Sequence, residues 1–179
     1  VKTVRENGLR AEGDTVSNGP SFDSTKEFLQ KILDEIKSGK TQLPDFQRGW
    51  VWDDDHVKSL LASISMSYPI GAVMLYETGN PDVRFKPRPV EGVTLEGTVK
   101  PEWLILDGQQ RLTSLYQALF SGDVVKTRDS RGNAIDRWYY LDIAKALDPV
   151  ADREDAIVSV PGDRMIKNFR GEILADYST

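Results

Sequence analysis

Two short stretches of the sequence place glutamine beside arginine in surroundings where polar side chains could bind an anion. The first, "WLILDGQQRLTSLYQAL" (residues 103–119), contains the DGQQR motif: Asp107, Gly108, Gln109, Gln110 and Arg111. Its pattern predicts a buried strand that ends at Asp107, followed by an amphipathic helix. The N–H groups at the start of such a helix attract anions, and Gly108 allows the backbone to approach a ligand closely.

Arg111 raises a physical question, because a cation in the first turn of a helix faces the positive end of the helix dipole. One answer is that Asp107, four residues earlier, compensates the charge as an ion pair. The other is that the site is built to hold a phosphate, onto which the guanidinium group can fork. The motif alone leaves both answers open, and the ion pair is the simpler one.

The second stretch, "LPDFQRGWVWDDD" (residues 43–55), places Gln47 and Arg48 among aromatic residues in an extended segment. A polar side chain in apolar surroundings must find a partner, because leaving it without one costs about 1–3 kcal/mol. Two separate Gln-Arg pairs therefore indicate one shared polar cleft. We expect Arg48 and Arg111 to line it together with Asp107.

The other candidate groups in the sequence give weaker indications of a functional site. The run 53–55 is interpreted as a helix N-cap and first-turn carboxylates rather than as metal ligands, and no metal-ligating residues are predicted. The only histidine, His56, fits a surface helix position, which argues against histidine acid–base chemistry. The chain has no cysteine and contains no Walker loop, GxGxxG, HExxH or nucleophile elbow.

In the order "LPDFQRGWVW", "LLASISMSYPIGAVMLYE" and "WLILDGQQRLTSLYQAL", the sequence resembles the amino-terminal domain of the GmrSD family of modification-dependent restriction endonucleases. The resemblance covers about Leu43 to Leu119. It implies an α+β fold similar to ParB and sulfiredoxin, a small mixed β-sheet with flanking helices. In that fold the motif at the strand-to-helix junction contacts nucleotide phosphates.

The resemblance also implies NTP binding and hydrolysis coupled to antiphage restriction of modified or foreign DNA. By motif position, it implies catalytic roles for Asp107, Gln110 and Arg111 and nucleotide-binding roles for Gln47, Arg48, Gly108 and Gln109. The arginines would neutralise phosphate charge, Asp107 would position water or metal, and the glutamines would orient the nucleophile or the γ-phosphate.

The implied cofactors are an NTP, with GTP, UTP, CTP and ATP not distinguished, and Mg²⁺. DNA is the expected partner of the full-length protein, and a homo-oligomer is left open. Two other functions also remain open. The same residues could cut DNA directly as a ParB-like phosphodiesterase, or the chain could be a non-enzymatic sensor or docking module.

Composition sets the frame for these candidates. The chain has 179 residues, 28% of them charged, and a net charge of −5, which argues against a broadly cationic DNA-binding surface. Two basic clusters, Arg84/Lys86/Arg88 and Lys126/Arg128/Arg131, are candidate DNA contacts, although solvated loops are the simpler interpretation. No apolar run approaches the ~18 residues of a membrane helix, so a cytoplasmic location is the default expectation.

The predicted organisation is a flexible N-terminal arm over residues 1–21 and one domain over 22–179. A helix should start at a capping box of Ser24 and Glu27 and stop at Gly39, and a second should begin at the run 53–55. Strands are expected at "AVMLYE", "RWYYLDIA" and "AIVSV", with a small hairpin at "VTLEGTVK". Because the chain begins without methionine, we expect a fragment of a longer protein. The family resemblance implies a C-terminal nuclease module further along that protein, often of the HNH type.

Overall fold

The computed structural model describes residues 2–7, 21–80 and 84–178, and its mixed helices and strands confirm the predicted α+β class. The chain divides into two compact units, which are described here one at a time. Unit 1 comprises Val1–Trp50 and Gly71–Tyr116, and unit 2 comprises Val51–Ile70 and Gln117–Thr179. A ParB-like topology and a single domain over 22–179 stay predictions.

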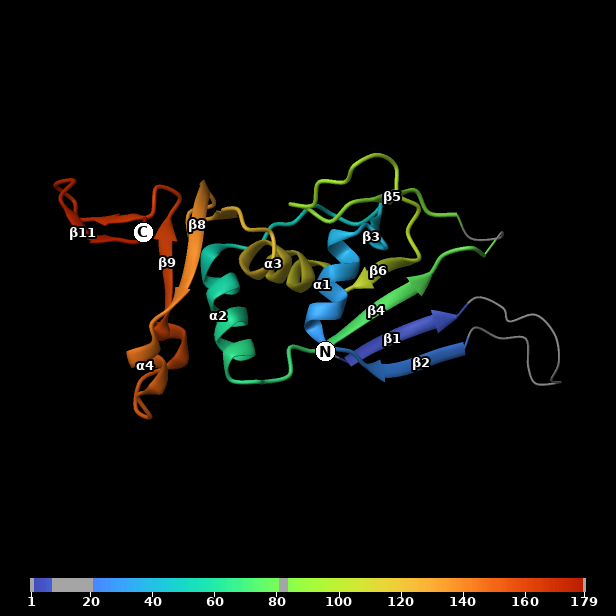
Figure 1. Cartoon of the computed structure of the whole chain (residues 1–179), viewed down its shortest axis with the longest axis horizontal. Coiled ribbons are helices and arrows are strands. Elements are labelled where there is room, and N and C mark those ends of the chain that lie inside the picture. The colour runs from blue at the N-terminus through green and yellow to red at the C-terminus, as the bar shows by residue number, and fades with distance from the viewer. Residues whose placement is uncertain (1, 8–20, 81–83, 179) are drawn as a thin grey trace. The chain divides into compact units, whose positions relative to one another are not determined.

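Unit 1 is built on a mixed sheet whose described strands follow the order β2-β1-β4-β6-β3-β5 (Figure 1). These strands are β1 (Lys2–Asn7), β2 (Ser21–Lys26), β3 (Thr41–Pro44), β4 (Ala72–Glu77), β5 (Pro87–Arg88) and β6 (Trp103–Asp107). The pairs β1–β4 and β3–β6 are parallel. The pairs β1–β2, β4–β6 and β3–β5 are antiparallel, so neighbouring strands of both senses meet in one sheet.

The centre of unit 1 lies at β6 and the helix that follows it, α3 (Gln109–Leu119). Because β6 runs between β4 and β3, Leu104 and Ile105 are almost completely buried. Leu112 and Leu115 are buried on the apolar stripe of α3. The predicted buried strand and amphipathic helix are therefore confirmed, and they meet at Asp107 and Gly108.

The first helix begins later than the sequence predicts. α1 (Leu29–Lys37) has Phe28 at its N-cap without a side-chain cap bond, so the predicted capping box of Ser24 and Glu27 is wrong. The residues before it form β2 instead, because antiparallel pairing with β1 satisfies their backbone hydrogen-bonding groups. The helix still buries the apolar face that its spacing predicts: Ile32, Leu33 and Ile36.

The predicted N-terminal arm lies mostly outside the described residues. Its described part includes Lys2–Asn7, which is strand β1 and pairs on both sides, with β2 and with β4. This part of the predicted arm therefore belongs to the sheet.

The predicted hairpin over residues 93–100 is wrong, because this segment contains no strand. Gln42 donates its side-chain amide to the Val99 carbonyl and to the Gly39 carbonyl, each at 2.9 Å. Gly39 has a φ of +76°, and a Cβ there would lie 2.9 Å from Leu95 and 3.2 Å from Val99. The segment therefore packs against Gly39, and the Gln42 side chain, rather than a neighbouring strand, bonds its backbone.

Unit 2 holds a three-stranded antiparallel sheet in the order β7-β8-β9, with α2 in contact with β9. Its elements are α2 (Asp54–Ser65), β7 (Val125–Arg128), β8 (Ala134–Leu141), α4 (Ile143–Leu147), the 3₁₀ helix η1 (Arg153–Ala156), β9 (Ile157–Pro161), β10 (Met165–Lys167) and β11 (Ile173–Asp176). The predicted second helix and the strand at "AIVSV" are confirmed. The strand at "RWYYLDIA" is confirmed as far as Leu141, and the end of that segment belongs to α4. None of the helices in the described part of the chain has the length and apolar composition needed to cross a membrane.

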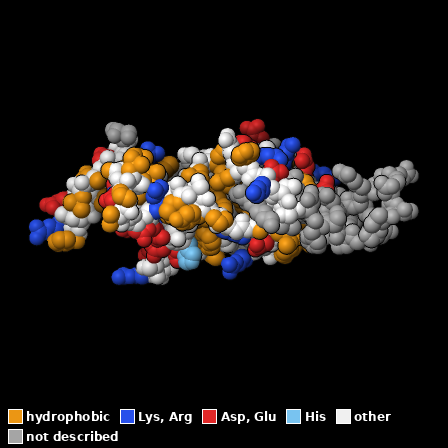
Figure 2. All heavy atoms as spheres, turned by 90° about the horizontal axis from the view of Figure 1, so that it is seen from below, with side chains coloured by type: hydrophobic (Ala, Val, Ile, Leu, Met, Phe, Trp, Pro, Cys, Tyr) orange, Lys and Arg blue, Asp and Glu red, His pale blue; other side chains and the backbone are white. Residues whose placement is uncertain are grey.

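The N-cap predicted for α2 is confirmed. Asp53 Oδ1 accepts a hydrogen bond from the His56 backbone N–H at 2.9 Å, and the His56 ring lies 2.6 Å from the same oxygen. Both side chains reach the surface, where Figure 2 shows the pale-blue imidazole beside red carboxylates. This arrangement favours a capping role for Asp53.

Candidate functional site

The junction between β6 and α3 turns sharply at Gly108. This glycine has a φ of +90°, a conformation that L-residues rarely adopt, and a Cβ there would lie 3.0 Å from Val73 Cγ2. Asp107, at the end of β6, keeps 72% of its side chain exposed. The turn therefore presents a solvent-accessible carboxylate directly before the first turn of α3.

Arg111 is anchored rather than free. Its Nη2 donates to the Ala72 carbonyl at 2.8 Å and to Asp107 Oδ2 at 3.3 Å. The guanidinium group lies so close to Gly71 that a Cβ at this glycine would overlap it. The cation that faces the helix dipole is thus compensated by Asp107 and by a backbone carbonyl, which answers the question raised by its position.

The segment of residues 45–50, here called the QR loop, follows β3 and lies against this junction. Gln47 Nε2 donates to the Leu106 carbonyl at 2.8 Å. In the opposite direction, Gln109 donates to the Arg48 carbonyl at 2.6 Å and Gln110 to the Gly49 carbonyl at 3.2 Å. The two glutamine-containing segments, which are far apart in sequence, are therefore joined within unit 1 by side-chain amides.

Arg88 and Glu91 complete the support of the QR loop and were missed by the sequence analysis, which treated Arg88 as part of a basic cluster. Arg88 Nη2 donates to the carbonyls of Gln47 and Arg48 at 3.1 and 3.3 Å. Its Nη1 bonds Glu91 Oε1 at 2.9 Å, and this oxygen also accepts the Trp50 N–H at 3.3 Å. The pairing of β5 with β3 brings Arg88 to this place, and only the Arg-to-Glu spacing of three residues could have indicated it.

The outer side of the QR loop carries free hydrogen-bond donors. In a trans peptide the N–H points opposite to the C=O, so the N–H groups of Arg48 and Gly49 point away from Arg88. Among the described residues neither N–H has a partner, and the exposed Arg48 guanidinium has none either. A Cβ added at Gly49 would meet no heavy atom within 4 Å, so this edge of the loop is open.

The seven site residues of the sequence analysis thus meet at one place, with different tasks. Three side-chain amides donate to backbone carbonyls, those of Gln47, Gln109 and Gln110. Gln109 is only 4% exposed. Arg111 pairs with Asp107. The groups that remain accessible are the carboxylate of Asp107 and the donors of Arg48 and Gly49.

A second polar cluster lies within unit 2. The carboxylate of Asp54 accepts hydrogen bonds from Tyr139 Oη at 2.7 Å and from Ser159 Oγ at 2.7 Å, and it lies 3.7 Å from Arg137 Nε. Burial, followed by the bond to Asp54, raises the pKa of the Tyr139 hydroxyl well above its usual range. The cluster ties the first turn of α2 to β8 and β9.

Neither cluster forms a metal centre by itself. Within the described residues there is no group of three or more His, Cys, Asp or Glu side chains able to hold a metal ion.

The basic cluster of Lys126, Arg128 and Arg131 lies around the β7–β8 turn, where Arg128 donates to the Gly132 carbonyl at 3.1 Å.

The family whose description is "GmrSD restriction endonuclease, N-terminal domain" matches residues 29–172. The chain belongs to this family. The uncharacterized protein MJ0686 of Methanocaldococcus jannaschii is 29% identical to it over 144 residues, which cover 75% of this chain. The chain spans only 23% of the length of that relative. No solved structure matches the chain.

Membership of the GmrSD family confirms the resemblance on which the sequence analysis relied. The matched range contains both the QR loop and the DGQQR motif, and it extends through most of unit 2. It relates the chain to restriction endonucleases. The arrangement of the QR loop then suggests what this amino-terminal domain contributes.

Proposed function

We propose that this GmrSD domain binds and hydrolyses a nucleoside triphosphate within a restriction system that acts on modified or foreign DNA. The observation that carries the proposal is the outer side of the QR loop. Two backbone N–H groups and one guanidinium group, from Arg48 and Gly49, lie there without partners among the described residues. Such donors suit a phosphate chain, which is multiply charged and accepts several hydrogen bonds.

The first turn of α3 strengthens this case. It contains no acidic residue, and its N–H groups carry the positive end of the helix dipole. The side-chain amides of Gln109 and Gln110 hold the QR loop beside this helix start. In the proposed site these glutamines position the loop, and Arg48 neutralises phosphate charge.

Hydrolysis would use the exposed carboxylate of Asp107. Water attacks the γ-phosphorus, the bond to the bridging oxygen breaks, and a nucleoside diphosphate and inorganic phosphate leave. Asp107 orients this water, and Arg111 keeps the carboxylate in place through the ion pair at 3.3 Å. Arg111 acts in this proposal as a positioning residue, because its Nη2 already bonds the Ala72 carbonyl and Asp107.

The residues at the site fit a Mg²⁺ ion that arrives with the triphosphate. Mg²⁺ commonly binds one or two carboxylates together with phosphate oxygens and water, and Asp107 is the carboxylate that could hold it here. The ion would neutralise the phosphate charge. A protein-only cage is not required for this chemistry.

Thermal melts with and without each Mg-NTP test the proposal. At a ligand concentration about 100 times the Kd, binding stabilises a protein by about 2.7 kcal/mol. For a chain of this size that corresponds to a rise in Tm of about 5–10 °C. Arg48→Ala should abolish most of this rise, whereas Arg131→Ala, which removes an exposed arginine of the β7–β8 turn, should leave it unchanged.

The other two functions give different results. A protein that melts at one temperature with all four common NTPs, up to about millimolar concentration, is a docking or sensing module and not a nucleotide-binding one. Nicking of plasmid DNA without nucleotide, lost in Asp107→Asn, would identify a ParB-like phosphodiesterase instead.

A further inference from the structure

A cavity of about 400 Å³ opens within unit 1 where β4 ends, beside β5 and the start of β6. Its size lies in the range of small-molecule sites, which begins at about 300 Å³. Its apolar wall includes Tyr76, Phe85, Pro101 and Leu104. None of its lining residues belongs to the QR loop or to the DGQQR motif, so the cavity is separate from the proposed nucleotide site.

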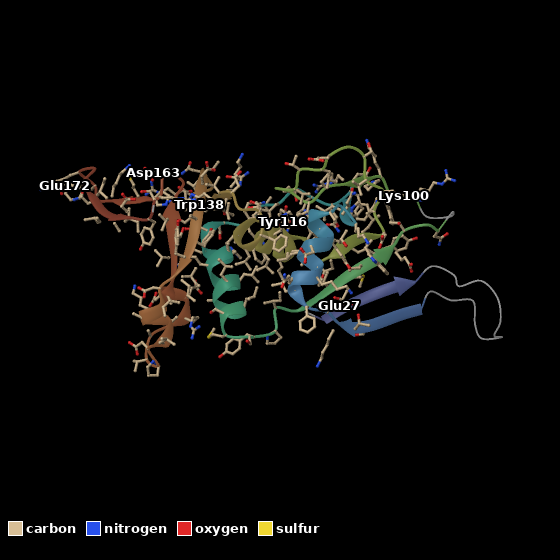
Figure 3. All side chains as sticks on the ribbon, viewed as in Figure 1. Glu27, Lys100, Tyr116, Trp138, Asp163 and Glu172 are labelled. Carbon is tan, nitrogen blue, oxygen red and sulfur yellow. The ribbon has the colours of Figure 1, made fainter. Side chains whose placement is uncertain are left out.

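The charged side chains among the described residues that line this cavity are both basic. Arg84 and Lys100 line it, both are exposed, and neither forms an ion pair with another described residue. No carboxylate of a described residue lines it, although the chain as a whole has 28 acidic and 23 basic residues. Figure 3 labels Lys100 beside the end of β4. Two cations beside an apolar cavity favour a ligand that combines a flat or apolar group with negative charge.

The aromatic wall is held in a fixed orientation. The ring of Phe85 meets Tyr76 edge-on, with centroids 5.7 Å apart at 83°. Phe46 meets Phe85 in the same manner at 5.2 Å and 65°. Phe85 is only half-buried, so part of its ring stays accessible from the cavity. A fixed, accessible aromatic ring is a platform on which a nucleobase can stack.

We infer that this cavity binds one nucleotide of a single DNA strand, with the base against Phe85 and the neighbouring phosphates on Arg84 and Lys100. A base inside a duplex is stacked on its neighbours and cannot enter a cavity of this kind without being extruded. The site therefore distinguishes unpaired from paired DNA. It goes beyond the proposed nucleotide hydrolysis, since its lining residues lie outside the proposed nucleotide site and no NTP is involved.

Fluorescence anisotropy of the 179-residue chain, without nucleotide, tests this inference. The probes are a labelled single strand of about 12 nucleotides and the same strand in a duplex. We expect tighter binding of the single strand. Removing both cations in Arg84→Gln/Lys100→Gln should lower the log–log salt slope by about 1.4, since each phosphate contact to a single strand contributes about 0.7.

Two further variants separate charge from stacking. Phe85→Leu keeps an apolar side chain but removes the ring, and it should weaken single-strand binding about 5- to 150-fold without changing the salt slope. Lys145→Gln on α4 removes one charge outside the cavity and should change neither quantity.

Equal affinity for single strand and duplex would overturn the inference, as would a salt slope that Arg84→Gln/Lys100→Gln leaves unchanged. The absence of single-strand binding up to about 100 µM, the upper end of ordinary non-specific affinity, would also overturn it. Because no nucleotide is present in the assay, none of these results bears on NTP binding.

Discussion

The support of the QR loop by Arg88 predicts opposite behaviour for two arginines of unit 1. Arg88→Ala removes three hydrogen bonds, at 2.9, 3.1 and 3.3 Å, to Glu91 and to two loop carbonyls. Arg48→Ala removes a side chain that has no partner among the described residues. The same substitution should therefore destabilise the protein in one case and not in the other.

The expected loss of stability in Arg88→Ala depends on how exposed its bonds are and on which carbonyls keep another partner. Bonds from a charged donor contribute about 1.5–3 kcal/mol when buried, but the Arg88 side chain is 30% exposed, which places each carbonyl bond nearer to about 1 kcal/mol. The partly exposed ion pair with Glu91 adds about 0–1 kcal/mol. The Arg48 carbonyl keeps its bond from Gln109, so the loss is about 2 kcal/mol in total.

Differential scanning calorimetry or fluorescence melts measure the difference. A loss of about 2 kcal/mol lowers Tm by about 4–8 °C in a chain of this size. Arg48→Ala should stay within about 0.5 kcal/mol of the wild type, as surface substitutions usually do. Equal changes in Tm for the two variants would refute the assignment of Arg88 as the anchor and Arg48 as the free cation.

Three more substitutions test other parts of the structure. Gly108→Ala should cost about 1–3 kcal/mol in urea unfolding, because the positive φ and the contact with Val73 both oppose a Cβ; unchanged stability would contradict the turn geometry. Hydrogen bonds from the backbone N–H and from the ring of His56 lower the pKa of Asp53 below its ordinary 3.8. The stabilisation that this cap gives the folded state is therefore present above that pH and is lost as the pH falls below it. Asp53→Ala should thus lose about 1 kcal/mol at pH 7 and progressively less toward pH 3, whereas a difference that grows on acidification would refute this. Tyr139→Phe should cost about 1–3 kcal/mol, since the partly buried carboxylate of Asp54 loses a donor, and an unchanged midpoint would show that the hydroxyl is not needed.

Much of the fold could be predicted because its signals are local. The four apolar residues before Asp107 require a strand covered on both faces, and the periodic apolar residues after Gly108 require a helix. The start of the first helix could not be predicted in this way. Ser24 and Glu27 have the spacing of a capping box, but β2 pairs along its whole length with β1, whose residues lie 14 to 24 positions from their partners in sequence.

The candidate site was predictable in its location but not in its division of tasks. Two Gln-Arg pairs in partly apolar sequence predicted a shared polar site, and hydrogen bonds between the two segments join them. Which arginine would be anchored depends on β5 pairing with β3 and on the approach of Gly71 to Arg111. These are tertiary contacts, and no local pattern encodes them.

Isothermal titration of Mg-NTP into the wild type and into Gly49→Ala tests the central proposal most directly. Gly49 does not have a left-handed φ, and no atom lies within 4 Å of an added Cβ, so the variant should fold with unchanged Tm or be slightly more stable. If phosphates bind along this open edge, the added methyl group should crowd them and weaken binding about 5- to 150-fold. A wild type that binds an NTP as tightly as Gly49→Ala does would contradict the proposal that the QR loop holds the phosphates.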